Sequence, residues 1–250
     1  MAGGSLIKVL ETKNLERWEK VTMEARLILE SLIQSGKEIA DGATQYAEKH
    51  LGLPTDAEQQ KTVLKNLGTG AAIGAATTLL LGTKAGRRIA GKVAAAGTIA
   101  TVGALAYQAY KRWSQNHGTT PSAEDAPLSA LSGPAADKRN LTILRAMVAA
   151  ANADGSIDPS EKAAIAAQLQ TMDVSEESKA WLQREFQTPR TPWNVASLAD
   201  TPAAAAEIYT FSSLIIDEAN PSEEAYLEEL RAALQLEPGL AADLKAQFAR

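Results

Sequence analysis

The chain has 250 residues, with 30 acidic and 25 basic side chains, a net charge of −5 and no cysteine. This length allows one large or two small domains, and the lack of cysteine excludes disulfides, iron–sulfur clusters, thiolate zinc sites and cysteine nucleophiles. Apolar residues make up 45% of the chain, many of them alanine, and aromatic residues only 5%, which favours closely packed helices over a thick β core. His50 and His117 lie outside the segment that looks globular, so histidine catalysis has no support.

Charge is unevenly distributed along the chain. Residues 66–113 carry six Lys or Arg and no acid, whereas residues 138–250 carry 10 basic and 17 acidic residues. An acidic domain repels phosphate backbones, so no nucleic-acid partner is expected. The basic segment is also apolar, which points to membrane lipid as its partner.

Residues 1–65 are predicted to form an amphipathic helical region. Within it, residues 14–50 have the pattern of one long helix with an imperfect apolar face, which ends near Pro54. Such a helix packs on its neighbours or self-associates, and the alternative is a helix lying on a membrane surface. The first ten residues lack the charged start and long apolar run of a signal peptide.

Residues 66–113 are predicted to be a Gly/Ala-rich transmembrane or membrane-associated helix or hairpin. Residues 67–83 give 17 consecutive uncharged residues, close to the lower limit for a membrane span. Residues 89–110 form a second such run, interrupted by Lys92 and followed by an aromatic and basic flank. Glycines four residues apart, as in a glycine zipper, allow close helix approach and self-association. The alternative is a soluble hairpin buried in an oligomer.

Residues 114–137 are predicted to be a flexible linker, because they contain three prolines and almost no bulky apolar residue. Residues 138–250 are predicted to form a helical domain, since no strand-like alternation occurs there. The expected fold class is therefore all-α: an amphipathic helix, a membrane helix or hairpin, a linker and a C-terminal bundle.

Local signals place several elements of the C-terminal domain. Ser175 and the Thr201-Pro202 pair are typical helix starts, and a further helix is expected to begin at Pro238. Trp181 and Trp193 are both predicted to be core residues.

An acidic turn, Asn152 to Glu161, joins two apolar helices of this domain. Asp158 and Glu161 occupy the first and last positions of a capping box, with a proline at the first helical position. The same residues fit an EF-hand-like register with Glu161 at loop position 12. Position 1 is then Ala150, where a calcium loop needs an acid, so the turn would need carboxylates from elsewhere.

A second acidic turn supplies such carboxylates. The sequence Asn220-Pro221-Ser222-Glu223 repeats the Asp158 to Glu161 pattern 62 residues later, which suggests a pseudo-repeat of two helix–turn–helix units. Packed face to face, the two turns could bind a hard cation such as Ca²⁺ or Mg²⁺. The candidate metal ligands are Asp154, Asp158, Glu161, Asp217, Glu218 and Glu223. The alternative is two capped helices with solvated acidic turns.

The stretch from Ala153 to Asp158 with Glu161, followed by Leu214 to Asp217 and Glu224 to Leu230, resembles the tellurite-resistance TerB-like domain. With its preceding Gly/Ala-rich segment, the chain more closely resembles the YebE-type family of bacterial inner-membrane proteins of unknown function. The resemblance covers residues 66–250. It implies an all-helical domain, divalent-cation binding, a role in envelope or metal stress and no enzyme activity.

The function expected from these features is that of a non-enzymatic, membrane-anchored protein of the bacterial inner membrane, whose acidic domain binds a divalent cation or a protein partner. The alternative is an oligomeric membrane scaffold that docks proteins and has no metal site. A hydrolase using paired carboxylates is disfavoured, because the chain shows no nucleophile motif, phosphate loop or substrate groove.

Overall fold

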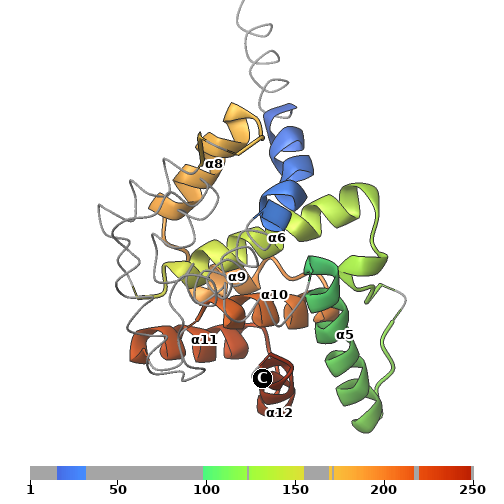
Figure 1. The fold of residues 1–250 in the computed structure, drawn as a ribbon. Helices are drawn as coiled ribbons and strands as arrows, with labels where there is room; N and C mark the ends of the chain where they lie inside the picture. The colour runs from blue at the N-terminus through green and yellow to red at the C-terminus, as the bar shows by residue number, and fades with distance from the viewer. Residues whose placement is uncertain are drawn as a thin grey trace, which may run out of the picture.

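The computed structural model describes residues 16–31, 98–122, 124–154, 169–170, 172–216 and 220–248. All regular secondary structure in these residues is helical, which confirms the predicted class for this part of the chain (Figure 1). The elements are a helix over residues 16–31 (helix 16–31), α5 (Ile99–Asn116), the 3₁₀ helix η2 (Leu128–Ala130), α6 (Gly133–Ala151), α8 (Glu176–Gln187), α9 (Pro192–Ala196), α10 (Pro202–Ile215), α11 (Pro221–Ala233) and α12 (Pro238–Ala246).

Side-chain caps and prolines define where several of these helices begin. The hydroxyl of Ser175 accepts a hydrogen bond from the backbone N–H of Ser178, and that of Thr201 accepts one from Ala204. Proline occupies the first turn of α10 and α12. The predicted starts at Ser175, Thr201 and Pro238 are therefore confirmed, and each side-chain cap contributes about 1 kcal/mol to helix stability.

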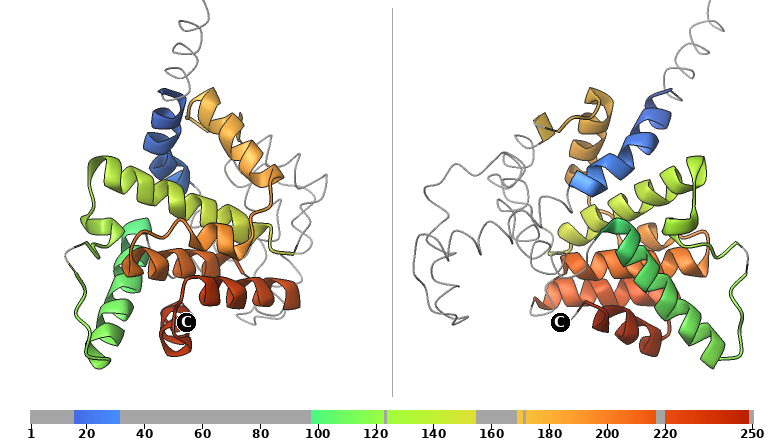
Figure 2. Two further views of the ribbon diagram at one scale, coloured as in Figure 1. Left: turned by 180° about the vertical axis from the view of Figure 1, so that it is seen from behind. Right: turned by 45° about the vertical axis from the view of Figure 1, so that its right-hand side comes forward.

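Helix α10 forms the centre of the body. Every residue from Ala203 to Ile215 is buried. Its first turns are an alanine run, which lets neighbouring backbones approach closely, and Phe211 fills the core further along. Figures 1 and 2 show α6 on one side of α10 and α11 and α12 on the other, with α5 also packed against it.

Helix α5 contains the end of the segment that we predicted to lie in a membrane, residues 66–113. Its buried side, which includes Val102, Ala106 and Ala109, packs against α10, and its exposed side carries charged residues such as Lys111. Residues 66–97 lie outside the described part of the chain. Among the residues that the structure describes, no helix has the length and apolar character needed to cross a membrane.

Residues 124–137 differ from the flexible linker predicted for 114–137. Asp125 is 5% exposed, and its Oδ2 accepts hydrogen bonds from the backbone N–H and hydroxyl of Ser122 at 2.8 and 3.0 Å. Leu128 is buried in the shared core, and α6 already begins at Gly133. The low apolar content suggested a tether, but one leucine and several polar contacts are enough to hold this stretch against the body.

The two tryptophans predicted to be core residues differ. Trp181 on α8 is 2% exposed, as expected, whereas Trp193 on α9 is 65% exposed, so the prediction for Trp193 was wrong. Helix α9 has only five residues and buries Pro192 and Val195. A helix this short offers little more than one turn, and the two residues between its inward positions, Trp193 and Asn194, face solvent.

Candidate functional site

The predicted metal ligands are only partly within the described residues. Asp154 lies just after the end of α6, and Glu223 lies in the first turn of α11. Both views of the fold place the end of α6 and the start of α11 at the same end of the body (Figures 1 and 2). Within the described ranges, no group of three His, Cys, Asp or Glu side chains is placed to hold a metal ion. The other four candidates, Asp158, Glu161, Asp217 and Glu218, lie outside these ranges.

The second acidic turn, where it is described, has the geometry of a capped helix. The side chain of Asn220 accepts a hydrogen bond from the backbone N–H of Ser222 at 3.1 Å and donates one to Glu223 Oε1 at 2.9 Å. Glu223 is 5% exposed. The capping interpretation therefore holds for the start of α11.

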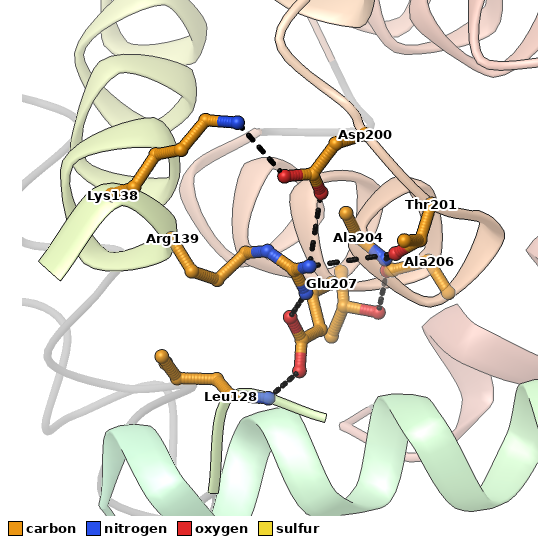
Figure 3. Close-up of polar contacts among 9 residues, drawn as sticks. Leu128, Lys138, Arg139, Asp200, Thr201, Ala204, Ala206 and Glu207 are labelled. Atoms are coloured by element: carbon orange, nitrogen blue, oxygen red, sulfur yellow. Dashed lines mark hydrogen bonds and ion pairs between the residues drawn. The ribbon is translucent and has the colours of Figure 1, made fainter. Parts of the chain in front are cut away.

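A buried ion pair joins α6 to α10 (Figure 3). Glu207 on α10 is fully buried, and Arg139 on α6 donates from Nη1 to its Oε2 at 2.7 Å. The other carboxylate oxygen accepts the backbone N–H of Leu128 in η2, also at 2.7 Å. On the outer side, Arg139 donates to Asp200 at 3.0 Å, and Lys138 donates to the same carboxylate at 3.0 Å.

Burial and neighbouring charges act in opposite directions on the pKa values of Glu207 and Asp200. Burial raises the pKa of Glu207, and the N–H of Leu128 together with Arg139 oppose this shift without cancelling it. Burial also acts to raise the pKa of Asp200, but the hydrogen bond from Lys138 and the charge of Arg139 prevail and lower it. A buried carboxyl facing an arginine is a common candidate for chemistry. Here, however, the second oxygen of the carboxyl is closely packed against α5, because a Cβ added at Gly103 would lie 3.2 Å from Glu207 Oε1.

The cluster around Glu207 is therefore a structural centre that binds η2, α6 and α10 together. Sequence reasoning missed it. The signal was present as a lone acid in the strongly apolar run from Ala203 to Phe211, and Arg139, its partner, lies 68 residues away. A lone carboxyl in a fully buried helix needs a cationic partner from another element.

A second site missed from the sequence is a cavity of about 250 Å³ between helix 16–31, the end of α8 and α6. We call it the arginine–tryptophan pocket. It is lined by Arg17, Trp18, Val21, Arg145, Trp181, Arg184, Glu185, Thr188 and Arg190.

Arg145 lies close to two indole rings of this pocket. Its guanidinium carbon is 5.7 Å from the ring centroid of Trp18 and 5.6 Å from that of Trp181, within cation–π range. Its Nε is 3.5 Å from Glu185 Oε1, too long for a good hydrogen bond. Burial lowers the pKa of Arg145; the charge of Glu185 opposes this shift, and the charge of Arg190 adds to it.

Arg190 binds the one carboxylate of the pocket, that of Glu185. Its Nε and Nη2 donate to the two oxygens of Glu185 at 2.7 and 2.8 Å, a bidentate arrangement. Two donors of the pocket remain without an acceptor. Both Arg145 Nε and Trp181 Nε1 are buried and make no hydrogen bond.

Comparison with known families matches one family model to this chain. The model is described as a protein of unknown function (DUF533) and covers residues 66–248. The matched stretch runs from upstream of α5 to the end of α12. No match was found among curated proteins, and none was found among solved structures.

Proposed function

The chain belongs to the family of proteins of unknown function (DUF533), and we propose that it is a non-enzymatic, membrane-anchored TerB-like protein of the bacterial inner membrane. The YebE-type arrangement of a Gly/Ala-rich segment before an acidic helical domain supports this proposal. Cell fractionation with protease protection of a C-terminal tag tests the anchor and its sidedness. Recovery of the full chain in the soluble fraction would contradict the anchor.

The proposed activity is binding of a divalent cation, Ca²⁺ or Mg²⁺, by the two acidic turns. The supporting observation is that the end of α6, followed by Asp154, and the start of α11, which carries Glu223, lie at the same end of the body (Figure 1). Of the remaining four candidates, Asp158 and Glu161 follow α6 in the sequence, and Asp217 and Glu218 precede α11. Carboxylate oxygens without histidine or cysteine suit hard cations.

Calorimetry and thermal unfolding of the full chain test this activity. We expect heat of binding and a higher melting temperature with millimolar Ca²⁺ or Mg²⁺, because a ligand that binds the folded state stabilises it. Replacing Asp154, Asp158 and Glu161 by their amides should abolish both effects. The matched control replaces three exposed acids on other elements, Glu124, Glu229 and Asp243, by their amides. No heat and an unchanged melting temperature in the wild type would refute cation binding.

A scaffold that docks proteins and self-associates through its glycine-rich helices is the second candidate. The observation in its favour is that large apolar side chains are exposed, with Trp193 65% and Met23 64% exposed, so they are available for contact with a partner. The amide variant of Asp154, Asp158 and Glu161 separates the two functions. Unchanged assembly of that variant, together with a wild type that binds no cation, would favour the scaffold.

A further inference from the structure

We propose that the arginine–tryptophan pocket binds the phosphate group of a phosphate monoester, either a small soluble molecule or a lipid headgroup. The pocket is formed by helix 16–31, α6 and α8, and its ligands are arginines rather than acids. The proposal is therefore independent of cation binding at the acidic turns.

The charge of the pocket favours an anion. Four guanidinium groups and one carboxylate line the pocket. The carboxylate, on Glu185, already accepts two hydrogen bonds from Arg190. Arg17 and Arg184 are exposed at the pocket and form no ion pair with a described residue. The excess of three positive charges is concentrated around a partly enclosed space, where an anion is screened less by water than on an open surface.

Two buried donors of the pocket that make no hydrogen bond also favour an anion as its ligand. Trp181 is 2% exposed, yet its Nε1–H has no acceptor, and Arg145 Nε has Glu185 Oε1 only at 3.5 Å, too far for a good hydrogen bond. A buried donor left unpaired costs about 1–3 kcal/mol. An anion with several acceptor oxygens that enters the pocket could satisfy donors that the protein itself leaves open.

Among anions, a phosphate monoester suits this pocket better than a carboxylate. It carries a charge of about −1.5 to −2 at neutral pH and three strong acceptor oxygens, whereas a carboxylate carries one charge and two oxygens. The excess of three positive charges can accommodate the larger charge. The volume of about 250 Å³ is smaller than the roughly 300–1,000 Å³ of pockets that hold drug-sized ligands, so a phosphate with a short ester substituent is the size that fits.

The arginines differ in how firmly they are held. The guanidinium of Arg145 is within cation–π range of both indole rings, and these contacts restrict its movement before a ligand arrives. Such preorganisation reduces the entropy lost on binding. Arg17 and Arg184 are exposed, so they can close on a ligand and can be changed without disturbing the core.

Calorimetric titration of the full chain in neutral detergent tests the proposal with four probes: inorganic phosphate, glycerol 3-phosphate, short-chain phosphatidic acid and short-chain phosphatidylcholine. The first three contain the phosphate group that the pocket should bind, and the fourth carries a phosphodiester with a compensating positive charge. We expect binding of glycerol 3-phosphate or phosphatidic acid, and none of phosphatidylcholine. Tighter binding of phosphatidic acid than of glycerol 3-phosphate identifies a lipid headgroup, and the reverse order identifies a soluble monoester.

The variant that tests the site is Arg17→Gln with Arg184→Gln, since neither arginine has an ion-pair partner among the described residues. Losing two charge-assisted hydrogen bonds should weaken binding at least about tenfold, with an unchanged melting temperature. The control, Arg26→Gln with Lys111→Gln, removes the same charge at exposed positions outside the pocket and should bind as the wild type does. Absence of binding by every monoester at 10 mM (about ten times a 1 mM Kd), or equal binding by the two double variants, would overturn the proposal.

Discussion

At the scale of single residues, Glu207 has the clearest effect on how stability depends on pH. Its carboxyl is fully buried, and burial raises its pKa despite the contacts with Arg139 and Leu128. A carboxyl whose pKa is higher in the folded than in the unfolded state stabilises the protein below its unfolded pKa, and this contribution is lost as the pH rises through the folded pKa. Arg139 limits that loss because it offsets the charge of the ionised form.

The variant Arg139→Met should therefore make stability depend more strongly on pH. Removing one partner of a buried ion pair costs about 3–5 kcal/mol, and the unpaired Glu207 then takes up a proton when the chain folds. We expect the free energy of unfolding to fall as the pH rises above about 4.3, the usual pKa of an unfolded glutamate, with a slope of up to about 1.4 kcal/mol per pH unit. Urea unfolding at several pH values measures this slope. The double variant with Glu207→Gln should lose the added slope, and a slope equal to that of the wild type in Arg139→Met would contradict the mechanism.

At the scale of the elements, helix 16–31 is joined to the start of α8 through one carboxylate. Glu24 Oε2 accepts hydrogen bonds from the backbone N–H and the hydroxyl of Ser175 at 2.9 and 2.7 Å. Partial burial acts to raise the pKa of Glu24, but the hydrogen bonds from Ser178 and Ser175 prevail and lower it. The contact also places a negative charge at the positive end of the α8 dipole.

This contact predicts a loss of stability in acid. Because the folded pKa of Glu24 lies below its unfolded value, the contribution is present above about pH 4.3 and is lost as the pH falls through the folded pKa. The variant Glu24→Gln should lower the free energy of unfolding at pH 7 by roughly 0.5–1 kcal/mol, a capping contribution reduced by solvent screening.

Thermal unfolding at pH 7 and at pH 3 measures this effect. The difference between Glu24→Gln and the wild type should be present at pH 7 and smaller at pH 3. Glu19→Gln, an exposed position on the same helix, is the control and should match the wild type at both pH values. A difference at pH 3 as large as that at pH 7 would show that packing, and not the carboxylate, joins the two helices.

The sequence predicted helix starts well and contacts between elements poorly. Ser175 and Thr201 were found because a cap depends on residues within one turn, and this local chemistry is visible in the sequence. The arginine–tryptophan pocket could not be found in this way. Trp18, Arg145 and Glu185 come from three separate segments, and no short motif links them.

At the scale of the whole molecule, the main difference from the sequence-based expectation concerns α5. An alanine- and glycine-rich apolar run suits a membrane helix and equally suits a helix packed against the alanine run of α10, so composition alone does not separate the two. The contact of α5 with α10 and the burial of Leu128 place residues 98–130 in the same body as the C-terminal helices. For the metal site, four of the six predicted ligands lie outside the described residues, and that site remains a prediction.

The position of α5 predicts where the chain can be shortened. A fragment of residues 98–248 should be more stable than a fragment of residues 133–248, because the shorter fragment exposes the surface of α10 that Val102 and Ala106 cover and leaves Glu207 without the N–H of Leu128. Each buried apolar side chain that is lost costs about 1–3 kcal/mol. Urea unfolding and dye binding to exposed apolar surface distinguish the two fragments. Equal stability of the two would contradict this role of α5.

Because α5 is bound to α10 from its first turns, a pulling force applied to the chain upstream of Thr98 would act directly on the hydrophobic core. Residues 98–116 would not simply extend under such a force, because they form α5 and its N-cap. If the preceding segment is held in a bilayer, tension or bending of that bilayer would be transmitted through α5 to its packing against α10.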